Sequence, residues 1–172
     1  MYIIVPMPYG CLPGKKLSNA SRGILRKALE LWENSFRSVR MDTRVVLGAF
    51  ADESEIKLRK EIIDGCLPHG TDRVRILDLG VARNEETLIL KLWQEIENTK
   101  CDGFVVFTEA THLTGIKPIF RKCFGSLPEF RVFPVSFEAN HPWITARFPF
   151  LWRWRNRWIS SYYKARMWLK AS

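Results

Sequence analysis

The chain has 172 residues, of which 47% are hydrophobic, and a formal net charge of +9. This length and composition suit one compact domain with a sizeable core. No apolar stretch reaches the roughly 18 residues that a membrane-spanning helix needs, and an apolar run from residue 2 leaves no room for a signal peptide. The cysteines, at positions 11, 66, 101 and 123, lack the paired spacing of a metal site. We therefore expect free thiols in an intracellular, cytoplasmic protein.

Charge and indole rings are concentrated toward the C-terminus. Residues 144–172 contain seven Lys or Arg and no acid, so subtracting these seven from +9 leaves only +2 for everything before them. Five of the seven Trp also lie between residues 143 and 168. We therefore divide the chain into an α/β domain over residues 1–140 and a basic, Trp-rich helical extension over 141–172, packed on that domain or projecting from it.

Short apolar runs alternate with helical periodicity along the α/β domain. The runs predict strands over residues 2–6, 44–47, 74–77, 103–107 and 131–135, and the periodicity predicts helices over 19–36, 53–64 and 85–98 and after His112. Strand–helix alternation is typical of parallel sheets. The expected fold is a three-layer α/β/α Rossmann-like sandwich with a mostly parallel five-stranded sheet and a C-terminal basic aromatic helix. Neither the glycine fingerprint of dinucleotide-binding folds nor a phosphate-binding P-loop is present.

Polar residues follow the predicted strands, where a parallel sheet gathers ligand-binding loops at one edge. Asp52-Glu53-Ser54-Glu55 opens the second helix. One interpretation is a capping box, in which Asp52 accepts from the backbone three residues on and Glu55 reaches back. The other places Glu55 or Glu53 in the crevice, facing ribose hydroxyls or a metal. Under either interpretation these carboxylates disfavour a phosphate at the start of this helix.

The next loop runs from Asp78 to Thr87. We place Asp78 at the end of the third strand, a common position for ribose-binding or metal-binding acids. Arg83 is a candidate anion contact, because the paired N–H groups of its planar guanidinium match carboxylates and phosphates. The alternative is local: Asn84 caps the third helix, while Glu85 and Glu86 favour its dipole.

The loop Thr108-Glu109-Ala110-Thr111-His112 combines hydroxyls, a carboxylate and an imidazole after a buried strand. His112 could act as a general acid or base near neutral pH, with Glu109 beside it. The alternative has Thr111 as an N-cap and His112 as an ordinary first-turn residue. We favour the functional interpretation here.

At these residues the chain resembles the SanA, ElyC and YdcF-like family of α/β domains, over roughly residues 17–135. The shared motifs are Arg22 in Ser21-Arg22-Gly23-Ile24-Leu25, Gly48 before Ser54-Glu55, the loop from Asp78 to Glu86, and Val106-Phe107-Thr108-Glu109-Ala110-Thr111-His112. Three features depart from the family pattern. Val81, Arg83 and Asn84 stand where Ser, Asn and Thr are usual, Gly115 where an Arg usually follows the His, and Gly48-Ala49 where a glycine pair is usual.

The resemblance implies a domain that binds a nucleotide-like or phosphorylated small molecule. The reactions it suggests are hydrolysis or group transfer, with S-adenosylmethionine or a nucleotide as the cofactor. The expected roles are proton transfer for His112 and Glu109, anion binding for Arg22 and Arg83, and ligand positioning for Glu55, Asp78, Glu86 and Thr108. No metal site is expected. The alternative function is a non-catalytic scaffold or assembly subunit with a degenerate pocket.

The C-terminal segment is helical in pattern. Leu151, Trp154, Trp158, Tyr162, Ala165 and Leu169 share one face, and Arg153, Arg157, Ser160 and Lys164 lie opposite. One interpretation is a final helix that closes the outer layer of the sandwich. The other is a binding surface, over residues 147–172, for an anionic membrane surface, RNA or a partner protein.

Overall fold

A computed structural model describes residues 1–12, 14, 16–36, 42–50, 52–66, 75–125, 129–135 and 148–171. Two parts of the predictions lie outside these ranges. They are residue 74, the first of the strand predicted over 74–77, and residues 136–147, which include the start of the predicted extension. The predicted helices and the remaining predicted strands fall within them.

Five parallel strands form one sheet in the order β5-β4-β1-β6-β7. The strands are β1 (Tyr2–Pro6), β4 (Thr43–Ala49), β5 (Arg75–Val81), β6 (Gly103–Glu109) and β7 (Glu129–Val135). The predicted Rossmann-like sandwich with a five-stranded sheet is therefore confirmed. The short hairpin of β2 (Cys11–Leu12) and β3 (Lys16–Leu17), which follows β1, was not expected.

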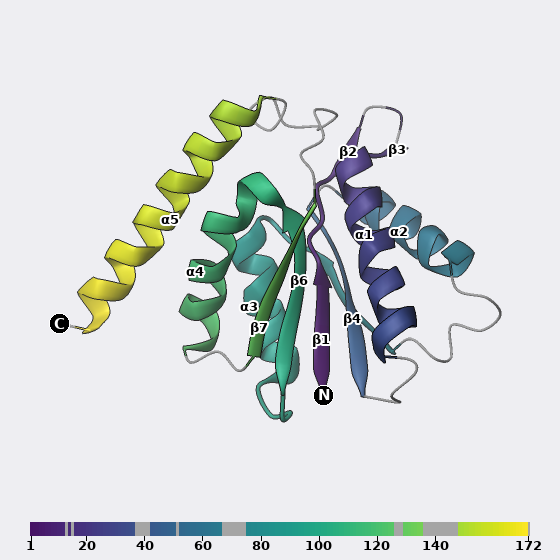
Figure 1. Cartoon of the computed structure of the whole chain (residues 1–172), viewed down its shortest axis with the longest axis horizontal. Helices are drawn as coiled ribbons and strands as arrows, with labels where there is room; N and C mark the ends of the chain where they lie inside the picture. Colours follow the sequence, from purple (N-terminus) through teal and green to yellow (C-terminus); the bar gives the residue numbers. More distant parts are fainter. Residues whose placement is uncertain are drawn as a thin grey trace.

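The helices cover both faces of the sheet (Figure 1). On one face lie α1 (Asn19–Leu31), continued by η1 (Trp32–Phe36), and α2 (Glu53–Cys66); on the other lie α3 (Glu85–Ile96) and α4 (Leu113–Phe124), the latter preceded by η3 (Ala110–His112). Right-handed crossovers explain this division, because the chain moves outward from β1 to β5 and then returns across the sheet to β6 and β7. The C-terminal helix α5 (Pro149–Ala171) packs outside α4.

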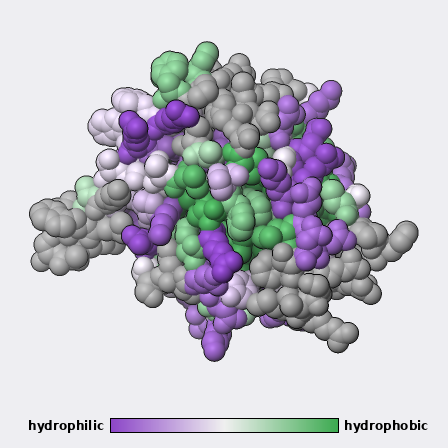
Figure 2. Space-filling view, viewed as in Figure 1, coloured by the Kyte–Doolittle hydropathy of each residue, from purple (hydrophilic) through white to green (hydrophobic). Residues whose placement is uncertain are grey.

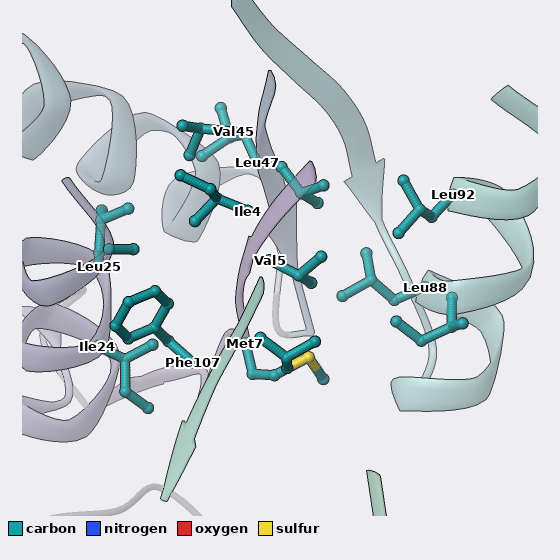
Figure 3. Close-up of a cluster of buried hydrophobic side chains, with 14 of the residues drawn as sticks. Ile4, Val5, Met7, Ile24, Leu25, Val45, Leu47, Leu88, Leu92 and Phe107 are labelled. Carbon is teal, nitrogen blue, oxygen red and sulfur yellow. The ribbon is translucent and has the colours of Figure 1, made fainter. Parts of the chain in front are cut away.

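The hydrophobic core lies on both faces of the central strands. Figure 3 shows Ile4 on the side of Leu25 in α1, whereas Val5 points toward Leu88 in α3. All four side chains are fully buried. Consecutive residues of a strand face opposite sides, so a central strand covered on both faces must be apolar throughout. This requirement explains why the apolar runs were clear in the sequence.

Local signals set the helix ends. The hydroxyl of Ser18 accepts from the backbone N–H of Ser21 (3.2 Å) and caps α1, and the side chain of Asn84 accepts from the N–H of Thr87 (2.9 Å) and caps α3. The local interpretation of Asn84 is thus confirmed. The alternative interpretation, in which Thr111 caps α4, is wrong, because η3 precedes that helix. The N-cap of α4 is His112, which makes no side-chain capping bond.

The buried face of α5 differs from the face that its apolar pattern predicts. Trp152, Asn156 and Ser160 are buried, whereas Trp154 and Trp158 are 63% and 65% exposed. The buried face of the helix is therefore a mixture of polar and aromatic side chains, and the side that carries Trp154 and Trp158 faces outward. No helix among the described residues has both the length and the apolar character to cross a bilayer.

The edge strand β7 is only partly covered. Phe133 is 38% exposed and stacks on Phe107 of β6, with ring centroids 5.2 Å apart. Figure 2 shows apolar surface in the middle of the face in view, with hydrophilic side chains toward both the α4–α5 side and the α1 side.

Candidate functional site

Two buried polar clusters lie at the carboxyl edge of the sheet, one on each face. The first, on the α1–α2 face, consists of Ser21, Glu55 and Arg59; the second, on the α3–α4 face, consists of Tyr9, Glu85, Thr108 and His112. Consecutive residues of the loop after β1 join them, since Tyr9 belongs to the second cluster and the N–H of Gly10 donates to Glu55.

Glu55 fastens two loops at the sheet edge. Its carboxylate accepts from the backbone N–H groups of Gly10 (2.9 Å) and Phe50 (2.7 Å), and from the hydroxyl of Ser21 (3.4 Å). Glu55 therefore bonds to groups beyond its own helix, as the interpretation that places it at the sheet edge requires. Asp52 instead accepts from the N–H of Ser54 (2.8 Å), two residues on. Glu55 is fully buried. Its hydrogen bonds to Gly10 and Phe50 hold the loops after β1 and β4 in place.

Arg59 lies one helical turn after Glu55 and is also fully buried. Its guanidinium donates to the carbonyl of Pro6 (2.7 Å) and to the hydroxyl of Ser21 (3.1 Å). Burial lowers the pKa of Arg59 to about 10, although the negative charge of Glu55 opposes this shift. The cluster thus places a buried cation beside a buried carboxylate, behind the end of β1.

In the second cluster, the hydroxyl of Tyr9 is the central atom. It lies 2.7 Å from Oγ1 of Thr108 and 3.0 Å from Nδ1 of His112, and it accepts from the backbone N–H of Glu109 (3.2 Å). Burial and the nearby Glu109 carboxylate raise the pKa of Tyr9 well above its usual value. A neutral phenol therefore orients the imidazole of His112.

The other ring nitrogen of His112 faces a carboxylate. Nε2 lies 3.7 Å from Oε1 of Glu85, and Nη1 of Arg155, from α5, lies 3.8 Å from the same oxygen. Glu85 and His112 are both buried. A hydroxyl on one side of the imidazole and a carboxylate on the other is an arrangement that can hold and transfer a proton.

The first turns of α5 cover this imidazole. Trp152 is fully buried, and its ring lies 5.4 Å from that of His112 and 6.4 Å from that of Tyr9. Asn156, one turn on, is also fully buried. A Cβ at Gly115 would lie 3.4 Å from Oδ1 of Asn156, so α5 occupies the space beside the position where the resembling family usually has an arginine.

A pocket of about 340 Å³ opens beside Glu85, between α3, α4 and α5. Its polar wall contains Glu85, Glu86 and Arg155, and its aromatic wall contains Trp158 and Tyr162. Glu86 bonds to Lys122 and to the hydroxyl of Tyr163. The remaining lining residues are Asn84, Ile119, Ile159 and Tyr163. This volume lies at the lower end of the range for small-molecule sites.

The structure places several predicted site residues elsewhere. Asp78 is not at the end of its strand, because β5 continues to Val81, and its carboxylate pairs with Lys60 of α2 (2.8 Å). Burial acts to raise the pKa of Asp78, but hydrogen bonds from Lys60 and from the N–H of Gly80 outweigh it and keep the pKa below its usual value. Arg22 and Arg83 are exposed and form no ion pair with a described carboxylate.

Thr108 and Glu109 end a strand and do not form a loop. Both are fully buried in β6. Since consecutive strand residues face opposite sides, Thr108 points with Tyr9 toward the His112 cluster, and Glu109 points toward the α1 face. The structure thus brings Thr108 and His112 together through Tyr9 and directs Glu109 away from them.

The sequence did not identify Tyr9, Arg59 or Trp152 as site residues. It also did not predict that Glu85 would be a partner of His112. One signal could have identified Arg59: its spacing of four residues from Glu55 on one helix face. Nothing in the sequence links Trp152 to His112, because that contact depends on how α5 packs. Within the described ranges, no group of three or more His, Cys, Asp or Glu side chains is placed to hold a metal ion.

No protein-family model, no curated protein and no solved structure matches this chain.

Proposed function

We propose that this chain is a YdcF-like domain that binds a nucleotide-like or phosphorylated small molecule at the carboxyl edge of its sheet. The observation that carries the proposal is the position of Glu85. Its carboxylate lines the 340 Å³ pocket and lies 3.7 Å from His112 and 3.8 Å from Arg155. A ligand in this pocket would therefore contact a charged group that is itself next to the imidazole.

The walls of the pocket match the parts of a nucleotide-like ligand. The rings of Trp158 and Tyr162 offer stacking surface for a base. The carboxylates of Glu85 and Glu86 can accept from ribose hydroxyls or from the amino group of S-adenosylmethionine. Arg155 can bind a phosphate or carboxylate with its planar fork. Of the ligand-positioning residues expected from the family resemblance, Glu86 lines this pocket.

The reaction that this arrangement would serve is hydrolysis or group transfer, with His112 as the proton-transfer group and Tyr9 as its positioning residue. Since Trp152 covers the imidazole, a reacting group would reach it through the side of the pocket at Glu85. The four cysteines are free thiols, which favours a reducing, intracellular setting for this activity.

A thermal-shift screen of adenosine nucleotides and S-adenosylmethionine tests the proposal. A ligand at a hundred times its Kd should raise the Tm by roughly 5–10 °C for a chain of this size. Glu85→Gln should abolish the shift, because it removes the charge at the pocket wall. Glu95→Gln, an exposed position further along α3, should leave it unchanged. A screen in which no nucleotide-like compound shifts the wild type would refute the proposal.

A second function, a non-catalytic scaffold or assembly subunit with a degenerate pocket, is favoured by the complete burial of Trp152 against His112. In that case no ligand would shift the Tm, and Glu85→Gln would alter only stability. The same screen therefore separates the two functions.

A further inference from the structure

The outward surface of α5 and α4 carries positive charge that no described carboxylate neutralises. A groove of about 500 Å³ between the two helices is lined by Lys117 and Arg121 of α4 and by Arg157 of α5. None of these three side chains forms an ion pair with a described residue. The groove also contains the hydroxyl groups of Thr114, Ser160 and Ser161 and no acidic side chain.

Such a groove suits a phosphate group. Lys117 and Arg121 are four residues apart and therefore lie on the same face of α4, and Arg157 approaches from the opposite wall. Three cations and three hydroxyls supply many donors and no competing acceptor charge. Figure 2 shows strongly hydrophilic side chains on this side of the apolar surface band.

An aromatic lane lies next to the groove on α5. It consists of Phe150, Trp154, Trp158 and Tyr162, which recur every four residues and are 68%, 63%, 65% and 53% exposed. The lane extends for about 18 Å along the helix. Beyond it, Leu151, Trp154, Trp158 and Ile159 line an apolar groove of about 560 Å³ that includes one charged residue, Arg155.

The exposed face of α5 therefore has an apolar centre with cations on both flanks. Arg153 and Arg157 lie on one flank, and Arg166 lies on the other, with its guanidinium 5.9 Å from the ring of Tyr162. The residues of α5 include no Asp or Glu. This distribution is that of a helix lying in a membrane interface, where aromatic rings occupy the headgroup boundary and Arg side chains reach anionic headgroups.

We propose that α5 docks this protein on an anionic phospholipid surface, with headgroup phosphates in the α4–α5 groove and the aromatic lane in the interface. A membrane explains the lane better than a nucleic acid does. Two exposed Phe side chains, Phe148 just before α5 and Phe150 in its first turn, offer no polar group. The rings of Trp154 and Trp158 meet in an edge arrangement, with centroids 6.1 Å apart, so they present no continuous platform on which successive bases of a nucleic acid could stack.

Flotation of the full chain with vesicles tests the proposal. The protein should float with phosphatidylcholine–phosphatidylglycerol vesicles and not with phosphatidylcholine alone, and the affinity should fall with added NaCl. The variant Lys117→Glu/Arg121→Glu/Arg157→Glu should bind at least about a hundredfold more weakly, since each lost cation is worth about fivefold. The variant Arg26→Glu/Lys27→Glu/Lys57→Glu makes the same charge change on exposed positions of α1 and α2 and should lose much less.

Two further measurements test whether the groove and the aromatic lane bind a phospholipid surface. Phe150→Ser/Trp154→Ser should weaken binding even in high salt, because it removes the apolar contribution; neither residue lines the pocket beside Glu85. Soluble glycerol phosphate should not displace the protein from vesicles. Equal losses in the two charge variants would overturn the proposal. So would displacement by glycerol phosphate, which would indicate a free-phosphate site, or tighter binding to single-stranded RNA that the groove variant abolishes.

Discussion

The hydroxyl of Tyr9 lies 3.0 Å from Nδ1 of His112, so a residue from the first loop of the chain fixes an imidazole that follows the fourth strand of the chain's parallel sheet. The next residue, Gly10, donates its N–H to Glu55 on the opposite face. The loop after β1 thus connects the two buried polar clusters. Its conformation determines whether either cluster can form.

Removal of the Tyr9 hydroxyl should therefore disturb the second cluster. We expect Tyr9→Phe to lower the free energy of unfolding by roughly 1–3 kcal/mol, because buried groups on Thr108, Glu109 and His112 lose their common partner. Urea denaturation measures the loss. The control is Tyr2→Phe, whose hydroxyl bonds to Glu129 at an exposed site (2.9 Å) and should matter little. An equal effect of both substitutions would contradict the central role of Tyr9.

The buried charges Glu55 and Arg59 should show strong coupling. Glu55→Gln or Arg59→Met alone should each destabilise the fold by roughly 3–5 kcal/mol, because each removes hydrogen bonds and leaves the other buried charge without an opposite charge beside it. The double variant should cost less than the sum, with a coupling free energy of about 1–3 kcal/mol. Chemical denaturation of the four proteins measures this difference. Strict additivity would show that the two charges act independently.

Two glycines should respond in opposite ways to alanine. At Gly103 a Cβ would lie 2.9 Å from the carbonyl oxygen of Glu129 and 2.9 Å from the ring of Tyr2, so Gly103→Ala must move backbone. We expect it to cost about 1–3 kcal/mol. At Gly23, within α1, a Cβ meets nothing within 4 Å, and Gly23→Ala should stabilise by about 0.5–1 kcal/mol. Thermal unfolding with opposite signs of the Tm change would confirm both.

The surface pair of Asp78 and Lys60 should contribute a small, pH-dependent stability. Because the folded state keeps the pKa of Asp78 below its usual value, the contribution is complete above the unfolded pKa of about 4 and is lost as the pH falls through the lower folded pKa. Asp78→Asn should cost about 0.2–1 kcal/mol at pH 7. The difference from wild type should vanish in strong acid. A difference that grows on acidification would contradict this assignment.

The amino-acid sequence alone was sufficient for the layered fold. The central strands are covered on both faces, so every side chain in them must be apolar, and a run such as Ile3-Ile4-Val5 is visible without any partner. Capping by Asn84 was predictable for a similar reason, since the contact is made within one helical turn. The positions of β5 and Asp78 were less clear, because β5 is an edge strand with exposed residues, and no continuous apolar run marks its end.

The candidate site was predictable only in part. Alternation of strands and helices was enough to place His112, Thr108 and Glu55 at one edge of the sheet. It could not identify their neighbours, because the contacts of Tyr9 with His112 and of Arg59 with Pro6 join segments that are distant in the chain.

The sequence by itself determined which segments become strands and helices, because burial on two faces requires continuous apolar runs, and helix caps are local. Only the tertiary structure decided which face of α5 is buried. An apolar stripe predicts burial of Trp154 and Trp158, yet α5 meets a surface that presents the rings of Tyr9 and His112, and against it Trp152 and the polar Asn156 are buried instead. The chemistry of the surface that a helix meets selects its inward face, and that surface exists only once the sheet has formed.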